Sequence, residues 1–469
     1  MKKTKIICSI GPASCNPDTM EQMVMAGMNV ARINFTHATI DERMAVLSTV
    51  EEVRRRTNEA VAIMWDTKGP EFRCGSFVDD KVVLEEGKTI RLVKDDIMGN
   101  SERFTVNHPE ALNYINVGDI VLLENAKMKL EVISKEDDGI TCKIVNGGIL
   151  GNRKSMSVPG VNLNLPYVSE NDLEDIEFAC SHGGEFLAIS FVSCKEDVLE
   201  IKEILKKNHR TDMQIICKIE SQLGINNIES ILEVSDGLMV ARGDLWTEIE
   251  SERLPIVQKK LIKKARSMGK ICIVATEILE TMMENSRPKR AETSDIANAV
   301  LDGTDAVMLS GETTVGKHPI ETVRAMGRIC EVTEQYADFD YVKSNKQENT
   351  VPLAIAESVV ATANRLDAKL ICAATMSGFT ARLISNFKPK TPILALCSSE
   401  EVRRRLALNW GVYSRCMPKL NSTDEVLNES VVYGKEFMNL ETNDKVVVTG
   451  GFPTAGGANT NLMKIEEVK

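Results

Sequence analysis

The stretch IICKIE, residues 215–220, decides the fold, because it is an apolar run that ends in two charged residues. Lys218 and Glu220 stand two positions apart, so they point to the same side of a strand. Several other apolar runs of the chain also end in polar or charged residues. Strands of a parallel sheet are buried along their length, so charges at the ends of many strands indicate a shared polar pocket. We expect the chemistry of the protein at that pocket.

The composition is that of an ordinary globular protein and argues against one class of partner. The chain has 469 residues, of which 43% are hydrophobic and 27% are charged, and its formal net charge is −11. This length predicts roughly two to four domains at about 150 residues each. The acidic balance argues against nucleic-acid binding, because no surplus of lysine and arginine is present to neutralise phosphates.

The beginning of the chain lacks the features of a signal peptide. In MKKTKIICSIGPAS the short apolar run soon reaches Gly11 and Pro12. No uninterrupted apolar stretch approaches the ~20 residues that span a bilayer. We therefore expect a cytoplasmic protein with no membrane partner. None of the twelve cysteines forms a CxxC pair, which favours reduced thiols over disulfides or a zinc site.

The order of strand-like and helix-like segments predicts a (β/α)₈ barrel, also called a TIM barrel. Apolar runs of strand length alternate with helical patterns such as residues 196–207 and 254–268. Eight parallel strands that alternate with helices form such a barrel, and its active site lies at the carboxyl ends of the strands. The expected strands are residues 5–10, 29–35, 61–66, 186–190, 214–220, 237–241, 271–276 and 306–310.

Two further domains are expected, so that the barrel comprises residues 1–69 and 159–340. Residues 70–158 alternate apolar and polar positions between turns, which predicts a small inserted β-barrel with antiparallel strands. This insertion is either a lid over the substrate or inert. After a polar linker, residues 350–469 predict a C-terminal α/β domain. Its strands are expected near residues 368–374, 392–395 and 445–449.

Residues that suit phosphates and cations close the second and third strands. In ARINFTH, Arg32, Asn34 and Thr36 share one side of the strand. A guanidinium suits phosphate, whereas amide and hydroxyl oxygens suit K⁺ or Mg²⁺. Asp66 and Thr67 extend this set of oxygens. A surface ion pair is the alternative interpretation of Arg32.

The fifth and sixth strands provide a candidate magnesium site. Glu220 and Asp244 close adjacent strands, and Mg²⁺ is commonly held by one or two carboxylates plus water and substrate oxygens. Lys218 can stabilise charge that develops on an oxygen in the transition state. A structural ion pair between Lys218 and an aspartate is the alternative. Thr276 and Ser310 add hydroxyls from the seventh and eighth strands.

Over essentially its whole length, the chain resembles the pyruvate kinase family. The matching segments are KIICSIGPAS, GMNVARINFTH, DTKGPE, ICKIE, MVARGDL, RPKRAETSDIANAVLDGTDAVMLSGET and TMSGFTA. The resemblance implies transfer of the phosphoryl group of phosphoenolpyruvate to ADP, which gives pyruvate and ATP in glycolysis. It also implies a barrel, an inserted β lid, a C-terminal regulatory domain and a homotetramer.

The resemblance assigns substrate roles to five positions. Arg32 would hold the phosphate of phosphoenolpyruvate, and Lys218 would steady the phosphoryl group during transfer. The substrate carboxylate would meet the hydroxyl of Thr276 and the backbone of Gly243 and Asp244. Arg32, Lys218 and Thr276 are therefore the expected catalytic residues.

The resemblance also assigns residues to the binding of cations and of the nucleotide. The ligands of Mg²⁺, or of Mn²⁺, would be Glu220 and Asp244. The ligands of K⁺ would be Asn34, Thr36, Asp66 and Thr67. The nucleotide, ADP or ATP, would contact Asn34, His37, Arg73 and Lys154.

Activation by K⁺ is expected from one position in particular. Glu71 resembles the K⁺-dependent members of the family, whereas K⁺-independent members have a lysine there. The alternative is that Glu71 pairs with a neighbouring base.

A regulatory site is expected in the C-terminal domain. Thr375, Ser377, Gly378 and Thr380 gather hydroxyls and backbone N–H groups just before a helix, which is typical of a phosphate cradle. In the family this loop receives a phosphorylated allosteric effector. The glycine-rich residues 449–461 resemble the second loop of that site, and a purely structural loop is the alternative.

Four positions depart from the family pattern. Trp246 stands where glycine is usual, Glu277 replaces glutamine, Thr36 replaces serine, and KSMSVPG replaces KGVNLPG after residue 153. An indole at 246 would narrow the pocket, and Glu277 would add negative charge beside an anionic substrate. These changes leave open a catalytically weak paralogue that acts as a phosphometabolite-binding sensor or regulatory subunit. A metal-dependent aldolase or lyase is a third interpretation, but it does not explain the inserted domain.

Overall fold

Eight parallel strands close into a barrel, in agreement with the expected fold. The computed structural model describes residues 1–339, 350–418, 420, 422–452 and 459–469. Around the barrel the strand order is β1-β16-β15-β14-β13-β12-β3-β2. The strands are β1 Lys5–Ser9, β2 Val30–Asn34, β3 Ala62–Asp66, β12 Phe186–Ile189, β13 Gln214–Ile219, β14 Gly237–Ala241, β15 Ile271–Ala275 and β16 Ala306–Leu309. Each lies within the expected range, and the polar residue that closes several of these ranges lies just beyond the strand.

Helices follow the barrel strands and bury one apolar face against them. In α4, Val198, Ile201 and Leu205 are buried at spacings of three and four residues, while the lysines of the last turn are exposed. The longer helices of this part are α1 Pro17–Met25, α2 Ile40–Thr57, α3 Glu170–His182, α4 Lys195–Lys207, α8 Leu254–Ser267, α9 Arg290–Leu301 and α11 Pro319–Glu334. The shorter ones are α5 Gln222–Asn226, α6 Ile228–Val234, α7 Arg242–Glu248 and α10 Gly311–Thr314.

An aromatic cluster joins β3 to α3 on the outside of the barrel. Trp65 is fully buried, and its ring stacks on Phe35 with centroids 5.1 Å apart. Phe178 meets the indole edge-on at 5.7 Å, and the indole N–H donates to the carbonyl of Gly183 at 2.6 Å. The buried indole is thus both packed and hydrogen-bonded.

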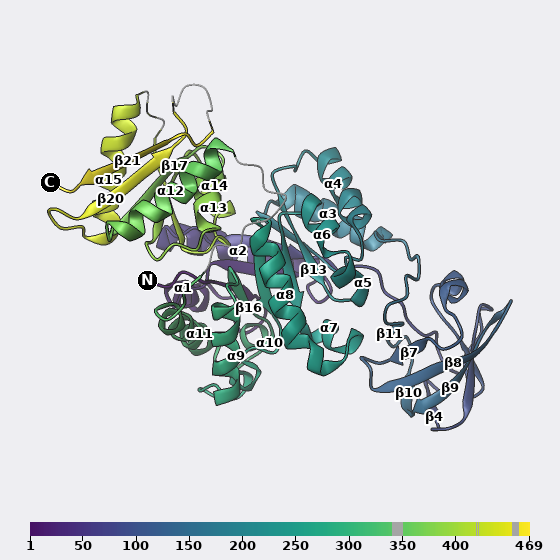
Figure 1. Ribbon diagram of the computed structural model, residues 1–469. Helices are drawn as coiled ribbons and strands as arrows, with labels where there is room; N and C mark the ends of the chain where they lie inside the picture. The colour runs from purple at the N-terminus through teal and green to yellow at the C-terminus, as the bar shows by residue number, and fades with distance from the viewer. Residues whose placement is uncertain (340–349, 419, 421, 453–458) are drawn as a thin grey trace.

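The inserted domain is a half-barrel of β-strands that follows the carboxyl end of β3 and projects from the barrel (Figure 1). One sheet has the order β11-β7-β8-β9-β5-β6, and a second sheet pairs β10 with β4. Most pairs are antiparallel as expected, but β5 and β6 run parallel, because residues 94–102 return the chain to the same end of the sheet. The strands are β4 Lys81–Leu84, β5 Thr89–Val93, β6 Arg103–Thr105, β7 Ile120–Leu123, β8 Met128–Glu136, β9 Gly139–Asn146, β10 Gly148–Gly151 and β11 Met156–Ser157.

The C-terminal domain lies on the other side of the barrel from the insertion (Figure 1). Its sheet has the order β19-β18-β17-β20-β21, in which only β21 is antiparallel to its neighbour. The elements are α12 Val351–Arg365, β17 Leu370–Thr375, α13 Phe379–Ser385, β18 Ile393–Cys397, α14 Glu400–Arg405, β19 Val412–Cys416, α15 Thr423–Met438, β20 Lys445–Gly450 and β21 Leu462–Glu467. The edge strands β19 and β21 were not expected, because their sequences, VYSRC and LMKIEE, are too polar to form an apolar run.

Two further expectations concern the cysteines and membrane-spanning helices. All twelve cysteines are free, as expected for reduced thiols. None of the described helices combines the length and the apolar character that a membrane crossing requires. Of the expected linker, residues 340–349 lie outside the described part of the chain.

Replacing Trp65 by alanine tests the importance of the aromatic cluster. Trp65→Ala should lower the free energy of unfolding by about 3–5 kcal/mol, because it empties a large buried volume. Trp246→Ala is the matched control, since that indole is 53% exposed and its loss should change stability by no more than about 0.5 kcal/mol. Urea denaturation followed by circular dichroism measures both. Equal midpoints for the two variants would contradict the expectation.

Candidate active site

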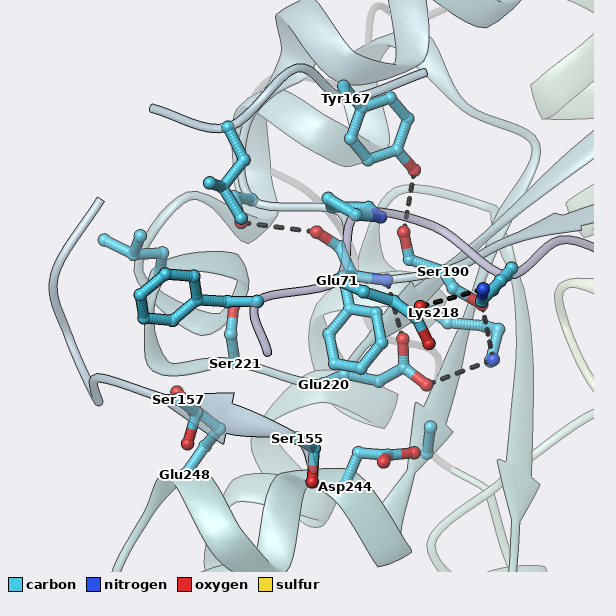
Figure 2. Close-up of a pocket in the computed structure, with 18 of the residues that line it drawn as sticks. Glu71, Ser155, Ser157, Tyr167, Ser190, Lys218, Glu220, Ser221, Asp244 and Glu248 are labelled. Atoms are coloured by element: carbon cyan, nitrogen blue, oxygen red, sulfur yellow. Dashed lines mark hydrogen bonds and ion pairs between the residues drawn. The ribbon is translucent and has the colours of Figure 1, made fainter. Parts of the chain in front are cut away.

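A buried cluster of four charged side chains lies at the carboxyl ends of the barrel strands. The carboxylate of Asp66 is 1% exposed and accepts hydrogen bonds from Arg32 Nε at 2.7 Å and from Lys218 Nζ at 3.2 Å. The same ammonium lies 3.1 Å from Glu220 Oε1, which is also 1% exposed. Figure 2 shows Lys218 pointing toward Glu220 and Ser190. The expected ion pair and the expected catalytic cluster are therefore one arrangement.

The partners offset the cost of burial for Asp66 and Lys218, but not for Glu220. Burial alone would raise the pKa of Asp66, but Arg32 and Lys218 lower it below its ordinary value. Burial alone would lower the pKa of Lys218, but Asp66 and Glu220 raise it. Burial raises the pKa of Glu220, and the nearby carboxylate of Asp244 adds to this rise. A positive charge close to Glu220 and Asp244 would stabilise the ionised form of both side chains.

Ser190 belongs to the cluster, although the sequence analysis did not include it. Its hydroxyl accepts a hydrogen bond from Lys218 Nζ at 2.6 Å and donates to the carbonyl of Thr67 at 2.6 Å. Its backbone N–H donates to the hydroxyl of Thr67 at 3.2 Å. The sequence did contain a signal for it. Ser190 is the last residue of the fourth expected strand, just as Asp66 is the last residue of the third.

Tyr167 and Phe191 are two further residues that the sequence analysis missed. The hydroxyl of Tyr167 donates to the carbonyl of Ser190 at 2.9 Å, and the N–H of Phe191 donates to Glu220 Oε2 at 2.6 Å. Burial raises the pKa of the Tyr167 phenol well above its ordinary value, so it keeps its proton. Tyr167 follows no strand and belongs to no motif, so the sequence alone carries no signal for it.

A cavity of about 910 Å³ opens between the barrel end and the inserted domain and contains most of the predicted residues. Residues 155–167, which lead from the insertion back to the barrel, form part of its wall. The predicted site residues that line it are Arg32, Asn34, Thr36, His37, Asp66, Thr67, Arg73, Lys218, Glu220, Asp244 and Thr276. Gly243 and Lys154 are not among the lining residues.

Gly243 and Thr276 are instead bonded to each other. The backbone N–H of Gly243 donates to Thr276 Oγ1 at 2.8 Å, so in this structure that N–H already has a partner. Thr276 and Glu277 both adopt left-handed φ angles, 69° and 52°, which are unusual for these residues. The guanidinium of Arg242 donates to the carbonyl of Thr276 at 2.6 Å and lies 2.6 Å from Asp295, and these bonds hold the turn.

Lys154 and Glu71 are engaged with other charged groups. The ammonium of Lys154 lies 3.6 Å from Glu124, a residue of the inserted domain. Glu71 lies 2.8 Å from Lys68 and 2.5 Å from Arg73. The alternative interpretation of Glu71, pairing with a neighbouring base, is thus what the structure contains.

The two most unusual substitutions lie away from the cavity. Trp246 is on α7 two residues after Asp244, which corresponds to a rotation of about 200° around a helix. Its indole is therefore exposed on the opposite face, and the expectation that it narrows the pocket is wrong. Glu277 is also exposed and does not line the cavity.

The residues of the cavity fit the expected cations. Glu220 and Asp244 bring two carboxylates together, and no group of three potential ligands from His, Cys, Asp and Glu occurs among the described residues. One or two carboxylates, with substrate and water completing the shell, suit Mg²⁺. The expected K⁺ ligands, Asn34, Thr36, Asp66 and Thr67, bring amide, hydroxyl and carboxylate oxygens to the same cavity.

A second, smaller cavity lies in the C-terminal domain at the expected effector loop. It has a volume of about 140 Å³, and Thr375, Ser377 and Thr380 line it. Gly378 adopts φ 83° and precedes α13, a conformation that favours glycine. The hydroxyls of Thr380 and Thr460 are 2.7 Å apart, which joins the two predicted loops. Residues 453–458 of the second loop lie outside the described part of the chain.

Comparison with known proteins identifies the family. Residues 1–323 match the model of the pyruvate kinase barrel domain, and residues 353–466 match that of the pyruvate kinase alpha/beta domain. The pyruvate kinases of Geobacillus stearothermophilus and Sporosarcina psychrophila are each 43% identical to the chain. Both alignments cover all of this chain, and they cover 80% and 81% of the two relatives, respectively. A crystal structure of a pyruvate kinase from Cryptosporidium parvum superposes with a TM-score of 0.94 at 35% identity, covering 100% of this chain and 96% of that one. The chain therefore belongs to the pyruvate kinase family of phosphotransferases.

Proposed function

We propose that phosphoryl transfer from phosphoenolpyruvate to ADP takes place in the 910 Å³ cavity, with Lys218 at its centre. The observation that carries this proposal is the buried Lys218 ammonium, held between Asp66 and Glu220. In the reaction, the bond between phosphorus and the enol oxygen breaks, and a bond between phosphorus and a terminal oxygen of ADP forms. The enolate that leaves takes a proton at its methylene carbon and becomes pyruvate. Such a transfer depends on positioning and positive charge more than on covalent chemistry, which suits this arrangement.

Different residues of the site would bind different parts of the substrate. Arg32 holds the phosphate of phosphoenolpyruvate, because a guanidinium that already orients on Asp66 keeps further N–H groups for phosphate oxygens. Lys218 stabilises the phosphoryl group during transfer. Thr276 and the backbone of Gly243 and Asp244 receive the carboxylate. Since the N–H of Gly243 donates to Thr276 here, its contact with a carboxylate requires a small rearrangement.

Cations complete the proposed site. Pyruvate kinases generally use divalent and monovalent cations. Glu220 and Asp244 would hold Mg²⁺ or Mn²⁺, which when bound supplies positive charge that neutralises the phosphoryl oxygens. The K⁺ ligands would be Asn34, Thr36, Asp66 and Thr67.

The nucleotide would bind between the barrel and the insertion. Asn34 and His37 of the barrel and Arg73 of the insertion line the cavity between these two domains. Lys154 contacts the nucleotide only if residues 70–158 move relative to the barrel, which consists of residues 1–69 and 159–340. We therefore assign the insertion the role of a lid.

Regulation and assembly are further parts of the proposal. Thr375, Ser377, Gly378 and Thr380 would receive a phosphorylated effector in the C-terminal domain, residues 350–469. A homotetramer and a cytoplasmic location are the states expected for the assembled enzyme.

The alternative of a catalytically weak sensor loses part of its support. It rested on four departures from the family pattern, and two of them, Trp246 and Glu277, lie outside the cavity lining. The other two, Thr36 and residues 154–160, include residues that line the cavity. Arg32, Lys218 and Glu220 are all present and mutually oriented. An aldolase or lyase is inconsistent with membership of the pyruvate kinase family.

Lys218→Met tests the central assignment. Removal of the ammonium should lower kcat for pyruvate formation by about 10²–10³-fold or more, because the charge on the phosphoryl group loses its main protein partner. Lys206→Met, which removes an exposed lysine from α4, is the control. A coupled lactate dehydrogenase assay with Mg²⁺ and ADP measures both variants. If Lys218→Met retained the full rate, the proposal for Lys218 would be refuted.

Replacement of K⁺ tests the monovalent site. Exchange of KCl for tetramethylammonium chloride at equal ionic strength should lower the rate at least about tenfold, the equivalent of 1.4 kcal/mol in the transition state. In Glu71→Lys the rate should no longer depend on K⁺, because the lysine places its own charge near the cavity. Glu85→Lys, a charge reversal at an exposed position of the insertion, is the control and should keep the K⁺ response. A wild-type rate that is equal in both salts would exclude the K⁺ site.

A negative charge in the effector cavity tests the regulatory site. Ser377→Asp should raise the half-activating concentration of a phosphorylated effector at least about tenfold, because like charges repel. The probes are sugar phosphates and nucleoside monophosphates, added at a subsaturating concentration of phosphoenolpyruvate. Ser358→Asp on α12 is the control. If none of these compounds changed the wild-type rate, the proposed effector site would be wrong.

A further inference from the structure

The peptide unit between Ser190 and Phe191, just after β12, is held at both of its polar ends. Its carbonyl oxygen accepts a hydrogen bond from the Tyr167 hydroxyl at 2.9 Å. Its N–H donates to Glu220 Oε2 at 2.6 Å. Figure 2 shows Tyr167 on one side of this segment and Glu220 on the other. A rotation of the peptide plane would break both bonds at once.

The backbone at this point is strained in a way that needs such support. Phe191 has φ 55°, and a bulky residue in the left-handed region is a genuine outlier. Strain of this kind persists only where the surroundings enforce it, and it occurs preferentially at functional sites. Gly69 permits a close approach of the chain to this peptide unit, since a Cβ there would lie 2.8 Å from the carbonyl oxygen of Ser190.

The orientation of this peptide unit determines how Glu220 presents its carboxylate. One oxygen accepts the N–H of Phe191, and the other lies 3.1 Å from Lys218 Nζ. With both oxygens engaged and only 1% of the side chain exposed, Glu220 has a fixed orientation. Magnesium demands nearly ideal ligand geometry, and groups that orient a ligand typically affect metal affinity 10–100-fold.

We propose that Tyr167 is a positioning residue for the divalent-cation site, because its hydroxyl fixes the peptide unit whose N–H orients Glu220. The ring of Tyr167 packs against the apolar core of the barrel, which fixes the hydroxyl in turn. Tyr167 touches neither the substrate nor the cation in this role. The inference rests on the proposed assignment of Glu220 to that cation.

Tyr167→Phe is the decisive variant, because it removes one hydroxyl and keeps the ring. The purified full-length enzyme is titrated with Mn²⁺ without substrates, and free Mn²⁺ is measured by its electron paramagnetic resonance signal. The dissociation constant should rise about tenfold or more, and the Mg²⁺ concentration for half-maximal activity should rise in parallel. The thermal midpoint should change little, since a general structural role would lower it without changing the affinity.

Two reference variants make the result unambiguous. Tyr413→Phe also removes a buried hydroxyl that donates to a backbone carbonyl, that of Lys2, at the junction with the C-terminal domain. It should leave the affinity for Mn²⁺ unchanged. Glu220→Gln tests the underlying assignment: wild-type affinity there would refute Glu220 as a ligand. Lost affinity in Glu220→Gln with wild-type affinity in Tyr167→Phe would overturn only the role of Tyr167.

Discussion

The buried carboxylate of Asp66 requires positive partners, and much of the active site follows from that requirement. An unpaired charge with 1% exposure would cost several kcal/mol, so Arg32 and Lys218 are needed on either side. The two cations come from β2 and β13, which lie next to β3 and two strands away from it in the barrel. The ion pairs that offset this burial therefore also hold a guanidinium and an ammonium at the site where we propose that phosphoryl transfer takes place.

The barrel and the core of its site could be predicted because both depend on local patterns. Each barrel strand is a mainly apolar run, and in several strands a polar residue ends the run or lies just beyond it. Glu220 follows β13 in this way, and Asp66 ends β3. Once the strands are parallel, these ends must meet at one edge, so the positions of charged residues along the chain are sufficient to locate the site.

The remaining features depend on contacts that no local pattern encodes. Tyr167 reaches Ser190 only because the chain returns from the insertion across the barrel mouth. The outward direction of Trp246 depends on the short helix α7 that follows β14. Lys154 lies beside Glu124 rather than in the cavity, because that carboxylate belongs to the same small domain. Side-chain direction in short helices and loops is a tertiary property, which explains why Tyr167 was missed, why the expectation for Trp246 was wrong and why the position of Lys154 could not be foreseen.

Strands β3 and β12, whose carboxyl ends lead to Asp66 and Ser190, also take part in the contact with the C-terminal domain. Glu185, just before β12, accepts the backbone N–H of Ile63 on β3 at 2.8 Å and a hydrogen bond from Arg404 on α14 at 2.6 Å. Asp66 ends β3 and Ser190 follows β12 at the opposite end of the barrel. The charged cluster at the carboxyl ends of these strands and the ion pair between Glu185 and Arg404 at their amino ends are thus joined by the same closely packed pair of strands.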